Sequence, residues 1–147
     1  MVPAIELTTT IPAPRETVWE DFRHIDRHVE WMHDAVRITF LSDNHEGMGT
    51  TFQCTTKVGP FVTEDIMRVT RWDEGQAVGV AHAGLISGEG VFTLADDVNA
   101  TVLTWREELH FPWWLGGAFT ALAARPILRL IWRKNLKNFS LRFSSPS

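Results

Sequence analysis

The fold of this chain is decided where a strand pattern gives way to a helix pattern, in residues 101–143, which read TVLTWREELHFPWWLGGAFTALAARPILRLIWRKNLKNFSLRF. From Thr101 to Phe111 apolar residues alternate with polar ones, which is the period of a half-buried strand. From Trp113 this alternation stops, and we expect one long helix from Trp113 to Phe143, kinked or divided at Pro126. The rest of the chain must supply the surface against which that helix packs.

The residues before this stretch predict six further strands. Runs with strand patterning lie between turns rich in Gly, Asn, Asp and Pro, and they cover residues 5–11, 35–41, 50–58, 61–72, 77–82 and 90–94. In the second of these strands we expect Val36, Ile38 and Phe40 on one face. Between the first two strands we expect a helix with Pro14 at its first position, then a second short helix capped by Asp26.

These elements predict an α+β fold. A curved antiparallel sheet of about seven strands surrounds the long C-terminal helix, with two short helices after the first strand. The chain has 147 residues, 44% of them hydrophobic, which fits a single domain over residues 1–147. The N-terminus shows no basic leader and no apolar export segment, so we expect a cytoplasmic protein.

The charge is divided unevenly along the chain. From Trp113 onward there are six basic residues and no acidic one, which leaves a balance of −10 in the first 112 residues. The overall charge of −4 argues against a nucleic-acid binder. Four of the basic residues are spaced by four and predict one helical stripe: Arg125, Arg129, Arg133 and Lys137.

Apolar residues of the same helix exceed what one sheet-facing side requires. Phe119, Ala123, Ile127, Leu130 and Leu141 are expected opposite the basic stripe, while Leu122, Leu128, Trp132 and Leu136 lie outside that arc. The uncharged stretch Phe111–Ala124 has 14 residues, fewer than the roughly 20 of a membrane-spanning helix. The surplus therefore suggests peripheral contact with a membrane, or a homodimer formed through the C-terminal helix.

Two residues are candidates for proton transfer. Glu107 falls on the apolar face of its strand, and His82 follows Val78 and Val80 in phase, so the two side chains are expected to share the interior if both faces point inward. The alternative for Glu107 is a carboxylate near the mouth of a cavity, paired with an arginine. The alternative for His82 is a histidine at a strand end or in solvent. The chain has no tyrosine and one cysteine, Cys54. Proton transfer must therefore use His, Asp, Glu, Lys or Cys54.

A metal site and a cofactor site are not expected. The histidines His24, His28 and His33 stand close in sequence, but a helix start at Asp26 would break the register that two imidazole ligands need. A solvated polar segment is the preferred interpretation. No phosphate-binding glycine loop or dinucleotide fingerprint occurs, and we therefore predict no metal and no cofactor.

Candidate ligand-binding residues are mostly aromatic. They are Trp31, Phe40, Phe52, Cys54, Trp105, Trp113, Phe119 and Ala123. Aromatic side chains present flat apolar surfaces, and an indole N–H can donate one hydrogen bond to a bound carbonyl. Plain core packing is the alternative role for several of these residues.

Three segments resemble motifs of a known superfamily. IPAPRETVW at residues 11–19, EWM at residues 30–32 and ATVLTW at residues 100–105 are similar to motifs of the START/Bet v 1-like (SRPBCC) superfamily, in its polyketide cyclase/dehydrase and lipid-transport branch. The resemblance implies a helix-grip fold with a hydrophobic cavity. Members of this group bind lipids, quinones, steroids or polyketides, and only some are enzymes. The shared motif residues are structural, so the resemblance assigns no catalytic residue.

Three functions follow as hypotheses. The first is binding or transport of a small hydrophobic ligand (a lipid, quinone or polyketide-like molecule) in an internal cavity, and it is preferred because the expected inner face has few polar groups. The second is a cyclase or dehydratase that uses Glu107, with or without His82. The third is a membrane-surface or partner-binding module that acts through the basic C-terminal helix.

Overall fold

The structure is a computed structural model and describes residues 4–144. Its elements follow the chain in the order β1 (Ile5–Ile11), α1 (Arg15–Phe22), η1 (Ile25–Glu30), β2 (Ala35–Phe40), β3 (Thr51–Val58), β4 (Phe61–Asp73), β5 (Ala77–Ala83), β6 (Ser87–Asp97), β7 (Ala100–His110), η2 (Trp113–Leu115) and α2 (Gly117–Leu141). The two η elements are short 3₁₀ helices.

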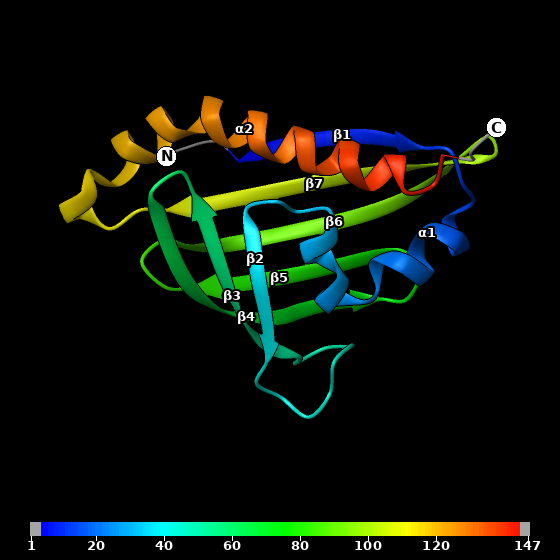
Figure 1. The fold of residues 1–147 in the computed structure, drawn as a ribbon, viewed down its shortest axis with the longest axis horizontal. Coiled ribbons are helices and arrows are strands. Elements are labelled where there is room, and N and C mark those ends of the chain that lie inside the picture. Colours follow the sequence, from blue (N-terminus) through cyan, green and yellow to red (C-terminus); the bar gives the residue numbers. More distant parts are fainter. Residues whose placement is uncertain (1–3, 145–147) are drawn as a thin grey trace.

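The strands form one antiparallel sheet. Its order is β1-β7-β6-β5-β4-β3-β2, so β1 and β2 are the edge strands. The sheet curves, and α2 lies lengthwise over β1 and β7, while α1 and η1 lie beneath the C-terminal part of α2 (Figure 1). This arrangement confirms the predicted α+β helix-grip fold.

Period-two patterning accounts for the two strands beneath α2. In β7 the side chains of Leu103 and Trp105 are buried, whereas Arg106 between Trp105 and Glu107 is exposed. In β1 Ile5 and Leu7 are buried in the same alternating manner. Successive residues of a strand face opposite sides, so these apolar positions all point to the concave face of the sheet.

The prediction for one face of β2 is wrong at Val36. The register between β2 and β3 shifts between Ala35 and Arg37, which is an irregularity of the β-bulge type. Such a shift moves one side chain out of phase with its strand. Ala35 is therefore buried, Ile38 and Phe40 are half-buried on the inner face, and Val36 is 51% exposed.

Two element boundaries also differ from the sequence prediction. Asp26 does not cap the second short helix, because η1 begins at Ile25 and Asp26 lies within it, with no side-chain cap at His24. Strand β6 begins at Ser87 and not at Gly90, since Gly88 and Gly90 are paired residues of the ladder with β5 and β7. Glycine within a strand is typical of a position that another group approaches closely.

The closing helix α2 is shorter than expected, and a different side of it faces the sheet. Gly116 and Gly117 have positive φ angles of 94° and 50°, so the chain turns there and α2 starts after η2, while Pro126 lies inside α2. The residues of α2 that are buried are Ala121, Trp132, Asn135, Leu136 and Phe139. Leu122, which was expected outside the apolar arc, is exposed. The five residues that were expected opposite the basic stripe are exposed as well: Phe119, Ala123, Ile127, Leu130 and Leu141.

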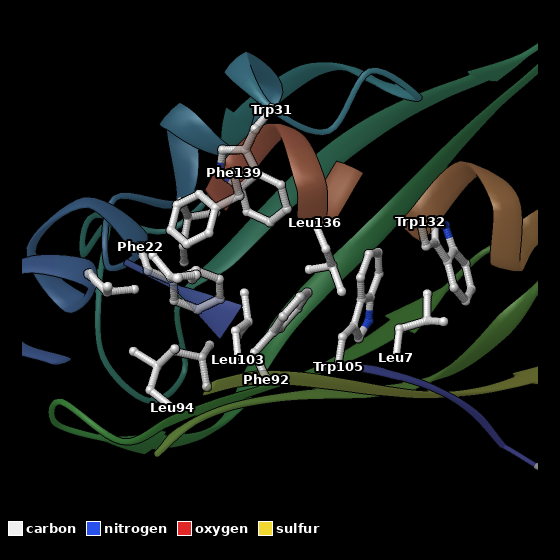
Figure 2. Packing of buried hydrophobic residues seen from close by; sticks show 14 of the residues in the cluster. Leu7, Phe22, Trp31, Phe92, Leu94, Leu103, Trp105, Trp132, Leu136 and Phe139 are labelled. Carbon is white, nitrogen blue, oxygen red and sulfur yellow. The ribbon is translucent and has the colours of Figure 1, made fainter. Parts of the chain in front are cut away.

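The core occupies the space between the C-terminal part of α2 and the sheet. Figure 2 shows Leu136 and Phe139 of α2 pointing toward the sheet, where Phe92 and Trp105 stand. The Trp105 ring stacks on Phe92 and on Trp132, with centroid separations of 4.8 Å in both pairs. This stack therefore fixes how α2 is rotated on the sheet.

Candidate functional site

A histidine and a glutamate meet on the concave face. Glu107 is buried on β7, two residues after Trp105, and His82 lies on β5 with a side chain that is only 9% exposed. His82 Nε2 lies 2.6 Å from Glu107 Oε1. The structure thus brings together the two residues that the sequence offered for proton transfer.

Two glycines of β6 make this contact possible. Strand β6 lies between β5 and β7, with Gly88 opposite His82 and Gly90 opposite Glu107. A Cβ atom at Gly90 would collide with the carboxylate of Glu107, and one at Gly88 would collide with the backbone of β7. The two side chains therefore reach across β6 through space that any larger residue would fill.

The surroundings of His82 favour its protonated form. Its Nδ1 lies 3.3 Å from the carbonyl oxygen of Ile86, while Nε2 faces the carboxylate of Glu107, so both ring nitrogens face oxygen acceptors. Burial alone would lower the pKa of His82, but the hydrogen bond and charge of Glu107 outweigh it, and the pKa is raised. The geometry fits an imidazolium that donates two hydrogen bonds.

Glu107 has both carboxylate oxygens occupied by this chain. Oε1 accepts from His82, and Oε2 accepts from the indole Nε1 of Trp105 at 3.0 Å. A carboxylate held in this way positions and charges His82 and has little freedom to approach a ligand. That Glu107 itself acts as the acid or base stays a prediction.

Asp65 is a buried carboxylate that the sequence pattern does not single out. It lies on β4 opposite Cys54, is buried, and its Oδ1 has no hydrogen-bond partner. Burial raises the pKa of its carboxyl, against the opposing charge of His82. The alternation of β4 places Asp65 on the same face of the strand as Val69. The sequence does not show that this face is the inner one, which becomes clear only from the pairing of β4 with β3.

Apolar side chains surround these polar groups. Phe52 and Cys54 of β3 are buried on the same face, and burial raises the pKa of the Cys54 thiol to about 11, which makes it a poor nucleophile. Half-buried apolar residues complete this end of the concave face: Ile38, Phe40, Met67, Val80 and Leu109. The helix α2 does not fully cover them.

The other candidate ligand-binding residues divide into two groups. Trp31 is a core residue, 1% exposed, that packs against Phe22 and Phe139. Trp113 and Phe119 are 87% and 80% exposed, and Ala123 is exposed as well, so all three lie away from the sheet. The expectation that these three residues line the interior is therefore corrected: Phe119 and Ala123 lie on the outward side of α2, and Trp113 lies on the exposed η2 that precedes it.

The histidines near the first helices do not assemble a site. His28 is buried, faces the carbonyl oxygen of Phe22 at 2.7 Å through Nε2, and lies against the rings of Phe22 and Trp31. Burial lowers its pKa to about 4. Among the residues from 4 to 144, no three His, Cys, Asp or Glu side chains are grouped as a metal would require.

Residues 4–144 include two surface hollows. One, of about 340 Å³, lies between β1 and α2 and is lined by Leu7, Thr8, Arg129, Arg133 and Lys137 among others. The second, of about 310 Å³, lies where α1 begins, beside the turn between β6 and β7. Neither reaches His82 or Glu107, so the expected internal cavity is not one of them.

Comparisons with known proteins agree with this fold. The chain resembles Ara h 8.0201 (TM-score 0.72, 12% identity, 97% of this chain and 98% of that one). It also resembles the Zhui aromatase/cyclase from Streptomyces sp. R1128 (TM-score 0.69, 18% identity, 95% and 92% covered) and a protein of Nitrosospira multiformis (TM-score 0.73, 13% identity, 97% and 97% covered). At these identities the likeness shows the fold alone.

A family model gives the assignment that the structural likenesses do not. No curated protein matches the chain. The family described as polyketide cyclase / dehydrase and lipid transport matches residues 3–143, which is nearly the whole chain. Its motifs and its helix-grip sheet agree with that match, and the chain belongs to the polyketide cyclase/dehydrase and lipid-transport family.

Proposed function

We propose that this protein binds a small apolar molecule on the concave face of its sheet and holds a hydroxyl group of that molecule at Asp65. The observation that supports this most strongly is the unpartnered Oδ1 of Asp65, buried beside apolar residues. Leaving a buried polar atom without a partner typically costs 1–3 kcal/mol, and a ligand donor would remove that cost.

The apolar surroundings define the rest of the ligand. Phe40, Met67 and Leu109 are half-buried although they face the concave side, so a ligand there would cover apolar surface that α2 leaves accessible. A carboxyl oxygen accepts a hydrogen bond from a hydroxyl in either protonation state, whereas a carbonyl ligand needs the carboxyl protonated. An alcohol or phenol with an apolar body is thus the ligand class that fits best.

The first experiment asks what the protein carries. Protein purified under native conditions is denatured, extracted with organic solvent, and the extract is analysed by mass spectrometry. We expect an apolar molecule with a hydroxyl group, near one per chain, and less of it from Asp65→Ala. Glu64→Ala is the matched control, because Glu64 is the exposed neighbour of Asp65 on the same strand.

The second experiment uses a pair of defined probes, 2-naphthol and 2-methoxynaphthalene, which differ in the ability to donate a hydrogen bond. We expect wild-type protein to bind 2-naphthol at least tenfold more tightly, since a hydrogen bond to a charged group contributes about 1.5–3 kcal/mol and about 1.4 kcal/mol corresponds to a factor of ten. Asp65→Ala should abolish that difference while Glu64→Ala retains it. Equal affinity of wild type for the two probes would contradict the role of Asp65.

A second candidate function is proton transfer, which the His82–Glu107 pair supports. An imidazolium held by a carboxylate lies near Asp65, whose free oxygen is the one that could receive a proton from carbon beside a ligand carbonyl. Cyclisation or dehydration of a polyketide-like substrate uses such a step. In this arrangement Glu107 positions His82, and Asp65 is the group that contacts the substrate.

Exchange of the α-protons of 2-tetralone in deuterated water, followed by NMR, tests this candidate. An enzyme of this type would exceed the buffer rate, lose the excess in Asp65→Asn, and show a shifted pH profile in Glu107→Gln. A rate equal to that of buffer would eliminate proton transfer and leave binding.

A further inference from the structure

The outer side of the closing helix exposes a group of large apolar residues. We define the apolar face as Trp113, Trp114, Phe119, Leu122, Ile127 and Leu130, which lie on η2 and the first half of α2 and are 55–87% exposed. In Figure 1, η2 and the first half of α2 form the yellow to orange end of the helical layer at the left of the picture. Contiguous exposed apolar surface of this kind usually marks a contact with a membrane or with another protein.

Cations without acidic partners continue the same helix. Within the described part of the chain, Arg142 at the C-cap of α2 is paired with Asp21 at 2.8 Å and with Glu30 at 3.5 Å. No acidic side chain of residues 4–144 lies within ion-pair distance of Arg129, Arg133, Lys134 or Lys137. The acidic body therefore does not neutralise these charges.

Three of these cations also line a groove large enough for a phosphate group. Arg129, Arg133 and Lys137 lie along the hollow of about 340 Å³ between α2 and the edge strand β1. The one acidic residue of that lining, Glu6, is paired with Arg106 at 3.5 Å. The groove is thus a cationic recess next to the apolar face.

We propose that the apolar face and these cations dock the protein on an anionic lipid bilayer, with lipid phosphates at the groove. Aromatic side chains favour the boundary between headgroups and acyl chains, and nearby cations attract anionic lipid. None of the helices in the described residues is long and apolar enough to cross a membrane, so the contact is peripheral. Charge complementarity favours lipid over a second copy, whose identical helix would bring the same positive charges to the interface.

Vesicle sedimentation tests the docking. Wild-type protein is mixed with vesicles of phosphatidylcholine alone, or of phosphatidylcholine and phosphatidylglycerol at 7:3. We expect binding to the anionic vesicles that weakens strongly in 0.5 M NaCl, because salt screens exposed charges. The triple variant Arg133→Ala/Lys134→Ala/Lys137→Ala should bind roughly a hundredfold more weakly, at about fivefold for each cation.

Matched variants separate this surface from general charge and from folding. The triple variant Arg37→Ala/Lys57→Ala/Arg68→Ala removes the same charge from exposed positions on the strands and should bind like wild type. Trp113→Ala/Phe119→Ala should reduce binding with an unchanged circular dichroism spectrum, since both side chains are exposed.

Three results would overturn the proposal. The first is no binding of wild type to anionic vesicles, and the second is equal weakening by the two triple variants. The third is a dimer in sedimentation velocity that Trp113→Ala/Phe119→Ala dissociates, together with no vesicle binding, which would make the apolar face an interface between copies of this chain.

Discussion

Acid should destabilise this protein through His28. The imidazole is buried between the rings of Phe22 and Trp31, with Nε2 bonded to the carbonyl oxygen of Phe22. Burial disfavours the charged form and lowers the pKa from 6.5 to about 4. His28 is therefore neutral in the folded protein at neutral pH and donates through Nε2.

The sign and size of the effect follow from linkage. A folded-state pKa below the unfolded value gives stability that is fully present above pH 6.5 and is lost as pH falls toward 4. With these two values the loss is about 2 kcal/mol at pH 5 and about 3 kcal/mol at pH 4. That is a large share of the 5–15 kcal/mol stability typical of a domain.

Urea unfolding followed by circular dichroism at pH 4, 5, 6 and 7 measures this. Carboxylates also titrate in this range, so the informative quantity is the difference between wild type and His28→Gln, which retains a donor but no ionisable group. We expect that difference to change by about 3 kcal/mol in disfavour of wild type from pH 7 to pH 4. Exposed His110→Gln serves as the control and should run parallel to wild type. Parallel curves for His28→Gln and wild type would refute a buried neutral histidine.

Three substitutions give further predictions. Gly90→Ala should lower the free energy of unfolding by about 1–3 kcal/mol and displace the Glu107 carboxylate, because the new Cβ would collide with it. Thermal unfolding measures the first effect, and the pKa of the His82 imidazole, followed by NMR, measures the second. Asn135→Ala should lower the free energy of unfolding by about 1–3 kcal/mol, since the amide of buried Asn135 donates to Asp34 at 2.6 Å in a partly buried contact, and Asn135→Asp should not restore the stability. Trp132→Ala should cost about 3–5 kcal/mol in urea unfolding, and a loss below 1 kcal/mol would show that its stack does not fix the closing helix.

Periodicity was sufficient to predict most of the sheet. The alternation from Thr101 to Phe111 predicted β7, and the pattern around Phe52 and Cys54 predicted β3. A strand with one buried face alternates apolar and polar residues, so its own sequence shows that it is a strand. Val36 departed from its predicted face because a bulge depends on the pairing of two strands. A pattern within one strand cannot show where its partner shifts register.

The candidate site was only partly predictable. Glu107 stood out as a carboxylate in phase with apolar residues, and the structure places it inward. Its contact with His82 depends on β6 passing between them with glycines at the two crossing positions. Asp65 stayed hidden, because the faces of β4 and β5 could not be assigned before their neighbours were known.

The sequence by itself determined the order of strands and helices, the inward side of β7 and the separation of charge between the body and the closing helix. Each of these is a local property that one segment carries alone. The tertiary structure decided the rotation of α2, because that helix is apolar on more than one side and its orientation depends on distant partners of Trp132 and Asn135. The same rotation decided which apolar residues pack on the sheet and which face outward beside the exposed Arg133, Lys134 and Lys137.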